Sequence, residues 1–495
     1  GPLEPVQVEL TGSGAGPTQV DNIEIYPSDN LMGMDRQIVM LARALHASAL
    51  RYPGGNFAEG YHWQDALGMP ERRPTTRNAA WGGAEPNRFG INEYMRLCRI
   101  MGAQPQLVVN AGNGTPQEAA GWVSFCNSSL RNRYGLMRAS SSSPEPYDVS
   151  LWEIGNELYG PWEIGHTDAA GNAQRYVEFR NAMLAADKSI HLIATGKGNE
   201  YSADGLKRDA QWNDELLRQA VANGGPAPDY LSIHPLLPLP SIAGNAGYQQ
   251  SYQSAMAFPT YFESALAPEV SHEIQAVEGP KASTKIAVTE WGLIVGGAGW
   301  QNNPNANQLA GALFCARFLN ALLRRSDTVT LANVTGLMHG GGIKKDRGMV
   351  YVDPQYYVQQ QYAAAQLQTP VFTSVSGPSS DVPARGGLPA VSNVPDLDLF
   401  AALTPQGRRL VLFVVNSDPA SLKPLDLTIR GFAAASVAAT ILTGASVRAT
   451  NSALNPNNVK PAPLTLPAYK NGTGWRIDIP ARSVVELAFS HDGSR

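Results

Sequence analysis

The sequence is poor in cysteine and in charge, and each shortage excludes classes of protein. Its 495 residues include three cysteines, Cys98, Cys126 and Cys315, too few for a disulfide scaffold and without metal-type spacing. We expect buried, reduced thiols. Charged residues make up 16% of the chain, and 38 basic against 42 acidic side chains leave a net charge of −4. Because no basic excess is present, nucleic acid is not an expected partner.

Long uncharged hydrophobic runs are missing as well. No stretch approaches the roughly 18–20 apolar residues of a membrane-spanning helix, so we expect no membrane partner. The apolar content of 43% nevertheless suffices for a large core and excludes general disorder. Low charge together with abundant Gly, Pro, Ser, Thr and Asn favours a secreted or periplasmic location.

The first two thirds of the chain alternate short apolar, β-rich runs with helical patterns. Eight such runs occur, at residues 6–10, 47–52, 106–110, 151–155, 191–195, 230–234, 285–289 and 331–337. Between them, apolar residues spaced by three and four predict helices, as in residues 32–45 and 169–188. Eightfold alternation of strand and helix predicts a (β/α)8 TIM barrel over residues 4–345.

The pattern changes after residue 345. Strand-like runs now follow one another, separated by Gly, Pro and Asn, at residues 397–403, 409–415, 424–429, 437–442, 475–479 and 483–489. Runs of this kind predict an antiparallel β-sandwich domain over residues 346–495. The Ser- and Pro-rich residues 374–385 are expected to form a loop.

Two glutamates follow strands of the expected barrel. Glu157 ends the run Trp152-Glu-Ile-Gly-Asn-Glu157, and Glu290 ends the run 286–290. Because active sites of barrels lie at the carboxyl ends of the strands, both carboxyl groups are expected at one rim. Such a pair suits glycoside cleavage: one carboxylic acid protonates the leaving oxygen while a second carboxylate attacks or stabilises the anomeric carbon. Glu153 alternates to the opposite face of its strand and is expected to be structural.

Other residues at the same rim suit a ligand. In Arg51-Tyr-Pro-Gly-Gly-Asn-Phe57 the glycines permit a tight turn that presents the Asn56 amide to a hydroxyl group. Trp81 either stacks on a sugar ring or anchors its loop. His234 is either a satisfied core residue or a hydrogen-bond partner of substrate or nucleophile. Scattered histidines and the lack of a phosphate-binding loop predict neither metal nor cofactor.

Long motifs in the chain resemble glycoside hydrolase family 51, the α-L-arabinofuranosidases. They are residues 50–65, 71–74, 152–157, 160–166 and 451–463. The resemblance implies a barrel with a C-terminal sandwich and a retaining, double-displacement mechanism, with Glu157 as acid/base and Glu290 as nucleophile. It also implies sugar contacts from Asn56, Trp81 and Asn156, and it is compatible with a homo-oligomer.

The chain departs from this family at three places. Leu236 stands where the family usually has Tyr, Thr289-Glu-Trp-Gly292 replaces Asp-Glu-Trp-Asn, and Glu24 is the candidate for the sugar contact after the first strand. The expected function is an exo-acting α-L-arabinofuranosidase on plant polysaccharides such as arabinoxylan or arabinan, or on derived oligosaccharides. A galactofuranosidase, an endo-glucanase or xylanase, a β-glucuronidase and a non-catalytic carbohydrate-binding protein remain alternatives.

Overall fold

The computed structural model describes residues 9–14, 16–17, 23–198, 211–239, 244–294, 303–386, 388–466, 469–471 and 474–491. Most of the first expected strand, residues 6–8, lies outside this set, and Glu9 and Leu10 are exposed and not in a strand. All three cysteines are buried and free, as expected. No helix within the described ranges has the length and apolar character needed to cross a membrane.

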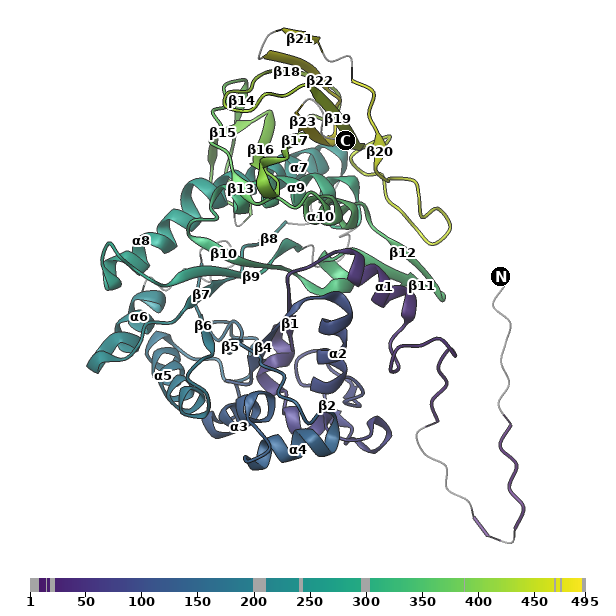
Figure 1. The fold of residues 1–495 in the computed structure, drawn as a ribbon, viewed down its shortest axis with the longest axis vertical. Coiled ribbons are helices and arrows are strands. Elements are labelled where there is room, and N and C mark those ends of the chain that lie inside the picture. Colours follow the sequence, from purple (N-terminus) through teal and green to yellow (C-terminus); the bar gives the residue numbers. More distant parts are fainter. Residues whose placement is uncertain are drawn as a thin grey trace.

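A curled parallel sheet forms the centre of the molecule and confirms the barrel prediction (Figure 1). Its strands follow one another in chain order: β1 (Ala49–Tyr52), β4 (Gln104–Val109), β5 (Leu151–Ile154), β6 (His191–Thr195), β7 (Tyr230–Ile233), β9 (Lys285–Ile294) and β10 (Val329–Val334). The short β8 (Leu236–Pro238) pairs with the end of β9. Within the described residues, β1 and β10 share no ladder, and a cavity of about 1150 Å³ lies between them.

Helices cover the outside of this sheet. They are α1 (Arg36–Ala44), α2 (Ile91–Met101), α3 (Pro116–Asn127), α4 (Arg133–Ser141), α5 (Ala169–Ala186), α6 (Trp212–Val221), α7 (Gly244–Tyr261), α8 (Ala267–Glu278), α9 (Leu309–Arg324) and α10 (Pro354–Ala364). The cap of α3 shows why such boundaries can be predicted: Thr115 accepts a hydrogen bond from the Glu118 amide, and Pro116 occupies the first helical position.

An antiparallel sandwich follows the barrel, as predicted. One sheet has the order β13 (Thr369–Pro370), β16 (Leu397–Leu403), β17 (Arg409–Asn416), β23 (Ser483–Ser490), β19 (Ser436–Leu442) and β20 (Ala462–Pro463); the other consists of β18 (Lys423–Thr428), β22 (Gly474–Ile479) and β21 (Tyr469–Asn471). The expectation of a loop at 374–385 is wrong in part, because β14 (Ser379–Val382) pairs with β15 (Val391–Pro395). Three of the four β14 residues are exposed, so the strand carries almost no apolar signal.

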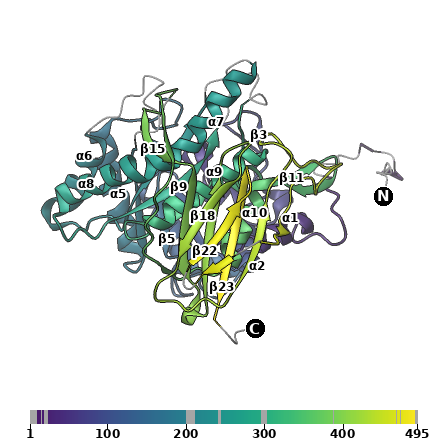
Figure 2. The same ribbon diagram turned by 90° about the horizontal axis from the view of Figure 1, so that it is seen from above.

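Strand β17 joins the sandwich to the barrel. Its residues alternate between two cores: Leu412 and its even-numbered neighbours face the sandwich core, whereas Phe413 and its odd-numbered neighbours belong to the barrel core. The Phe413 ring stacks on Tyr362 of α10 with centroids 3.7 Å apart. The sandwich therefore lies over α9 and α10 on one flank of the barrel (Figure 2).

Candidate active site

A buried polar layer lies inside the barrel below the rim. The register pairs Arg51 of β1 with Gln106 of β4, and β5 places Glu153 beside them. The Glu153 carboxylate accepts hydrogen bonds from Arg51 Nε (2.6 Å), Arg51 Nη2 (3.2 Å), Gln106 Nε2 (3.0 Å) and Thr289 Oγ1 (3.0 Å). Glu153 is therefore held by buried partners inside the barrel, and it shares Arg51 with Glu290 at the rim.

A β-bulge places Glu290 at that rim. Val288 pairs with Ala332 and Trp291 pairs with Val334, so Thr289 and Glu290 together oppose the single residue between those β10 partners. A bulge of this kind re-aims side chains, which explains why two consecutive residues of β9 both reach the site. Arg51 Nη1 donates to Glu290 Oε1 at 2.9 Å, and the Glu290 side chain keeps 17% exposure.

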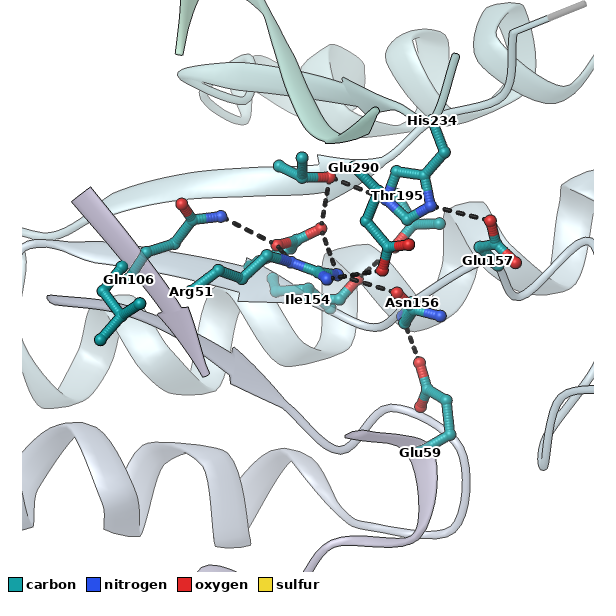
Figure 3. Close-up of polar contacts among 12 residues, drawn as sticks. Arg51, Glu59, Gln106, Ile154, Asn156, Glu157, Thr195, His234 and Glu290 are labelled. Carbon is teal, nitrogen blue, oxygen red and sulfur yellow. Dashed lines mark hydrogen bonds and ion pairs between the residues drawn. The ribbon is translucent and has the colours of Figure 1, made fainter. Parts of the chain in front are cut away.

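Glu157 lies on a tight turn after β5. Gly155 has a φ of +78° and Glu157 a φ of +44°, a conformation that non-glycine residues adopt rarely and often at functional sites. Glu157 Oε1 lies 2.8 Å from His234 Nδ1, and its Oε2 accepts a hydrogen bond from Trp162 Nε1 at 3.1 Å. Figure 3 shows the carboxylates of Glu157 and Glu290 near the ring of His234.

His234 is buried directly after β7 and contacts Glu157 and Thr289, the residue before Glu290. Its Nε2 lies 2.9 Å from Thr289 Oγ1. Burial alone would lower the pKa of His234, but the negative charges of Glu290 and Glu157 raise it and outweigh both burial and the repulsion from Arg51. The pKa of His234 therefore lies above its ordinary value.

Asn156 is held on three sides. Its Oδ1 accepts from Arg51 Nη2 at 2.8 Å, its Nδ2 donates to Glu163 Oε1 at 2.9 Å, and its backbone N–H donates to Glu59. These contacts fix the amide next to Glu157, with one Nδ2 hydrogen left over for a ligand.

Glu163 adds a third carboxyl group to the site. Burial chiefly raises its pKa to about 8, with a further rise from the charges of Glu157 and Glu290 against the lowering effect of the Asn156 hydrogen bond. Its Oε2 has no hydrogen-bond partner among the described residues. Glu163 is therefore mostly protonated at neutral pH, which limits the negative charge at this rim.

Glu157, Glu290, Asn156 and His234, all predicted from the sequence, thus lie in one hydrogen-bonded network. Asn56 is at the start of a short 3₁₀ helix (Gly55–Gly60) and lines a polar pocket of about 220 Å³.

Trp81 lies on the neighbouring hairpin of β2 (Thr76–Arg77) and β3 (Ala84–Glu85) and is 69% exposed. A Cβ on Gly55 would be 3.8 Å from its ring. Trp81 is therefore close to the turn that carries Asn56. Glu24, by contrast, contacts Arg88 at 2.8 Å and Tyr26, and neither of these contacts joins it to Glu157 or Glu290. Leu236 is 3% exposed and pairs with Gly292 on β9.

Arg51, Thr289 and Trp162 are among the residues of the network that had no role in the sequence-based prediction. A charged residue inside a β-rich apolar run, as Arg51 is, needs a buried partner, and this signal was available. Trp162 lies in the motif 160–166, but its bond to Glu157 depends on the turn that folds it back. Across the described ranges, no group of three or more His, Cys, Asp or Glu side chains is arranged to hold a metal ion.

A parallel barrel with one glutamate just after β5, a second in the latter half of β9, and a β-sandwich on its flank has the architecture of the barrel glycoside hydrolases. Residues 41–222 match the α-L-arabinofuranosidase 1 domain, and residues 289–483 match the α-L-arabinofuranosidase C-terminal domain. The chain belongs to the α-L-arabinofuranosidases of glycoside hydrolase family 51.

Individual relatives agree with this assignment. The chain is 29% identical over 315 residues to α-L-arabinofuranosidase C of Emericella nidulans, which covers 62% of this chain and 60% of that protein. It is 25% identical to the intracellular exo-α-(1→5)-L-arabinofuranosidase of Streptomyces lividans, over 90% of this chain and 67% of that protein. The α-L-arabinofuranosidase of Thermotoga maritima in complex with arabinose superimposes with a TM-score of 0.83 and 27% identity, over 94% and 92% of the two chains. The chain spans about 60% of the length of the probable α-L-arabinofuranosidase C of Aspergillus clavatus and of α-L-arabinofuranosidase C of Emericella nidulans.

Proposed function

We propose that the protein is a retaining, exo-acting α-L-arabinofuranosidase that releases arabinofuranosyl units from plant polysaccharides or their oligosaccharides. The observation that carries the proposal is the placement of two glutamates in different settings around one histidine: Glu290 is bonded to Arg51, and Glu157 is bonded to His234 and Trp162. The names of the Streptomyces and Thermotoga relatives support arabinose as the sugar.

Each glutamate has one role in the double displacement. Arg51 holds Glu290 Oε1, so Oε2 is the atom that attacks the anomeric carbon and forms the glycosyl-enzyme. Glu157 protonates the leaving oxygen as that bond breaks. Glu157 then takes a proton from the water that releases the sugar from Glu290.

The sugar contacts come from the neighbouring turns. The free Nδ2 hydrogen of Asn156 and the amide of Asn56 bind hydroxyl groups, and the exposed Trp81 ring offers an apolar face for the sugar. Because Asn156 is already fixed by Arg51 and Glu163, its contact costs little additional ordering.

The decisive experiment is hydrolysis of aryl glycosides: α-L-arabinofuranoside, β-D-galactofuranoside, β-D-xyloside, β-D-glucoside and β-D-glucuronide. We expect preferred cleavage of the arabinofuranoside. Preference for another sugar would refute the proposal that arabinofuranosides are the substrate, but it would not contradict the proposed roles of Glu157 and Glu290.

Two substitutions test those roles. Glu290→Gln and Glu157→Gln should each abolish most turnover, and only the Glu157 variant should recover with a good leaving group, because protonation is then less needed. The matched control is Glu118→Gln, which removes a carboxylate on α3 that is hydrogen-bonded to His62. Full activity of Glu157→Gln on a poor-leaving-group arabinofuranoside would contradict the acid/base role.

A further inference from the structure

The hydroxyl group of Thr289 donates its hydrogen bond to Glu153 Oε1, 3.0 Å away. The Glu153 carboxylate that receives it is buried and accepts four hydrogen bonds, which matches the four lone-pair positions of a carboxylate. Thr289 is itself 1% exposed. Its bond to Glu153 therefore completes the set of donors around a buried carboxylate, for which the loss of a donor would be costly.

The direction of the hydrogen bond from Thr289 to Glu153 determines the tautomer of His234. Because the Thr289 proton points to Glu153, Thr289 Oγ1 can only accept from His234 Nε2, 2.9 Å away. The proton of the neutral imidazole is then on Nε2. His234 Nδ1 remains facing Glu157 Oε1 at 2.8 Å, and a hydrogen bond between these two atoms requires one proton shared by the pair.

We propose that Thr289 is a positioning residue that keeps a proton on His234 Nε2, so that His234 Nδ1 and Glu157 share a single further proton. The consequence for Glu157 rests on its acid/base role in the proposed function, whereas the tautomer of His234 does not. The line of contacts runs from Arg51 through Glu153 and Thr289 to His234 and ends at Glu157 (Figure 3 labels its two ends and His234).

The arrangement makes one carboxyl group serve in two opposite steps. In the first step the shared proton moves from Glu157 to the leaving oxygen, which also takes the electron pair of the breaking C–O bond while Glu290 bonds to the carbon. The Nδ1 lone pair of His234 then faces the Glu157 carboxylate without a proton between them. This repulsion favours recovery of a proton, which the attacking water supplies in the second step as the bond to Glu290 breaks.

The charges around His234 act on the same proton. Glu157 and Glu290 raise the pKa of His234 and Arg51 lowers it, and the mostly protonated Glu163 lies beyond Asn156. Removal of the Thr289 hydroxyl group takes away the acceptor that lies 2.9 Å from Nε2, and this favours the neutral tautomer that donates from Nδ1 to Glu157. Glu157 would then be held ionised, which is the wrong form for the first step.

The test compares Thr289→Val, which keeps the shape and removes the hydroxyl group, with Thr289→Ser, which keeps the hydroxyl group. Nitrogen-15 NMR of histidine-labelled protein reports the tautomer, with the His234 signals identified by their loss in His234→Gln. We expect a proton on Nε2 in the wild type and in Thr289→Ser, and its loss from Nε2 in Thr289→Val.

Kinetics provide the second readout. The kcat/KM of Thr289→Val on poor-leaving-group arabinofuranosides should fall at least about tenfold, because the general acid would be in the wrong protonation state. It should lose less on activated ones, with a shifted pH profile. Thr289→Ser should retain the wild-type profile. An equal loss on all leaving groups with an unchanged pH profile would indicate a merely structural role and overturn the proposal.

The two proposals fail in different ways. If the wild type cleaves no arabinofuranoside, the proposed function is wrong, and NMR alone still decides the tautomer. If wild-type His234 carries its proton only on Nδ1, the Thr289 proposal is wrong whatever the substrate is and whether or not the valine variant folds.

Discussion

Glu153→Gln should destabilise the protein strongly although it changes a single atom. The carboxylate accepts two hydrogen bonds on each oxygen, and each oxygen receives one of them from Arg51. In the glutamine variant one oxygen becomes a nitrogen, so two of the four donors lose their acceptor in either amide orientation. Two lost bonds, one of them to a guanidinium whose side chain is 7% exposed, correspond to a loss of about 3–5 kcal/mol in the free energy of unfolding.

Urea denaturation followed by circular dichroism measures this loss. Asp214→Asn is the control, because it removes the partner of Arg218 from an exposed helix pair with 60% and 42% side-chain exposure and should leave the midpoint unchanged. A Glu153→Gln variant as stable as this control would refute the reasoning that the buried layer depends on a carboxylate. Since Arg51 also holds Glu290, we expect kcat to fall together with stability.

Three further predictions concern the same rim. The pKa of Glu163 rises from 4.5 to about 8 on folding, so the folded state binds more protons than the unfolded state between these pH values, and this carboxyl group lowers stability as the pH rises. The melting temperature of Glu163→Gln should therefore increase relative to that of the wild type from pH 5 to pH 9. A constant difference between the two melting temperatures would contradict the shift. Gly155→Ala should lower the free energy of unfolding by about 1–2 kcal/mol because of the left-handed φ of this residue, and further because the new Cβ would lie 2.8 Å from Leu158 Cδ1. The value of kcat should fall as well. Gly377→Ala, where a Cβ would meet no atom within 4 Å, is the control in thermal melting. Leu236→Tyr should change the ratio of kcat/KM values for arabinofuranosides and galactofuranosides, because it places a larger, polar side chain opposite Gly292, two residues after Glu290. An unchanged ratio would show that this position does not select the sugar.

Some elements were missed for reasons that are visible in their composition. The buried residues of helix α4 are Gly135 and Arg138, so its nine residues show no buried apolar side chain that could reveal a helical period. Helix α7 mixes Gln, Ser, Ala and Tyr and contains Pro259, so no apolar stripe distinguishes it from a loop. In both cases tertiary packing selects the helix over the weak local preference.

The sequence alone determined the strand–helix alternation, the change to a sandwich and the two rim glutamates. Hydrophobic period, turn residues and the rule that barrel strands end at one rim are local or topological signals, and they are readable without coordinates. Only the tertiary structure decided which groups those glutamates contact. Glu153 and Thr289 are 136 positions apart in the chain and meet across the barrel, and the bulge that directs Glu290 depends on its register with β10. Such contacts arise from the closure of the sheet, and no local pattern encodes a distance between strands that are far apart in sequence.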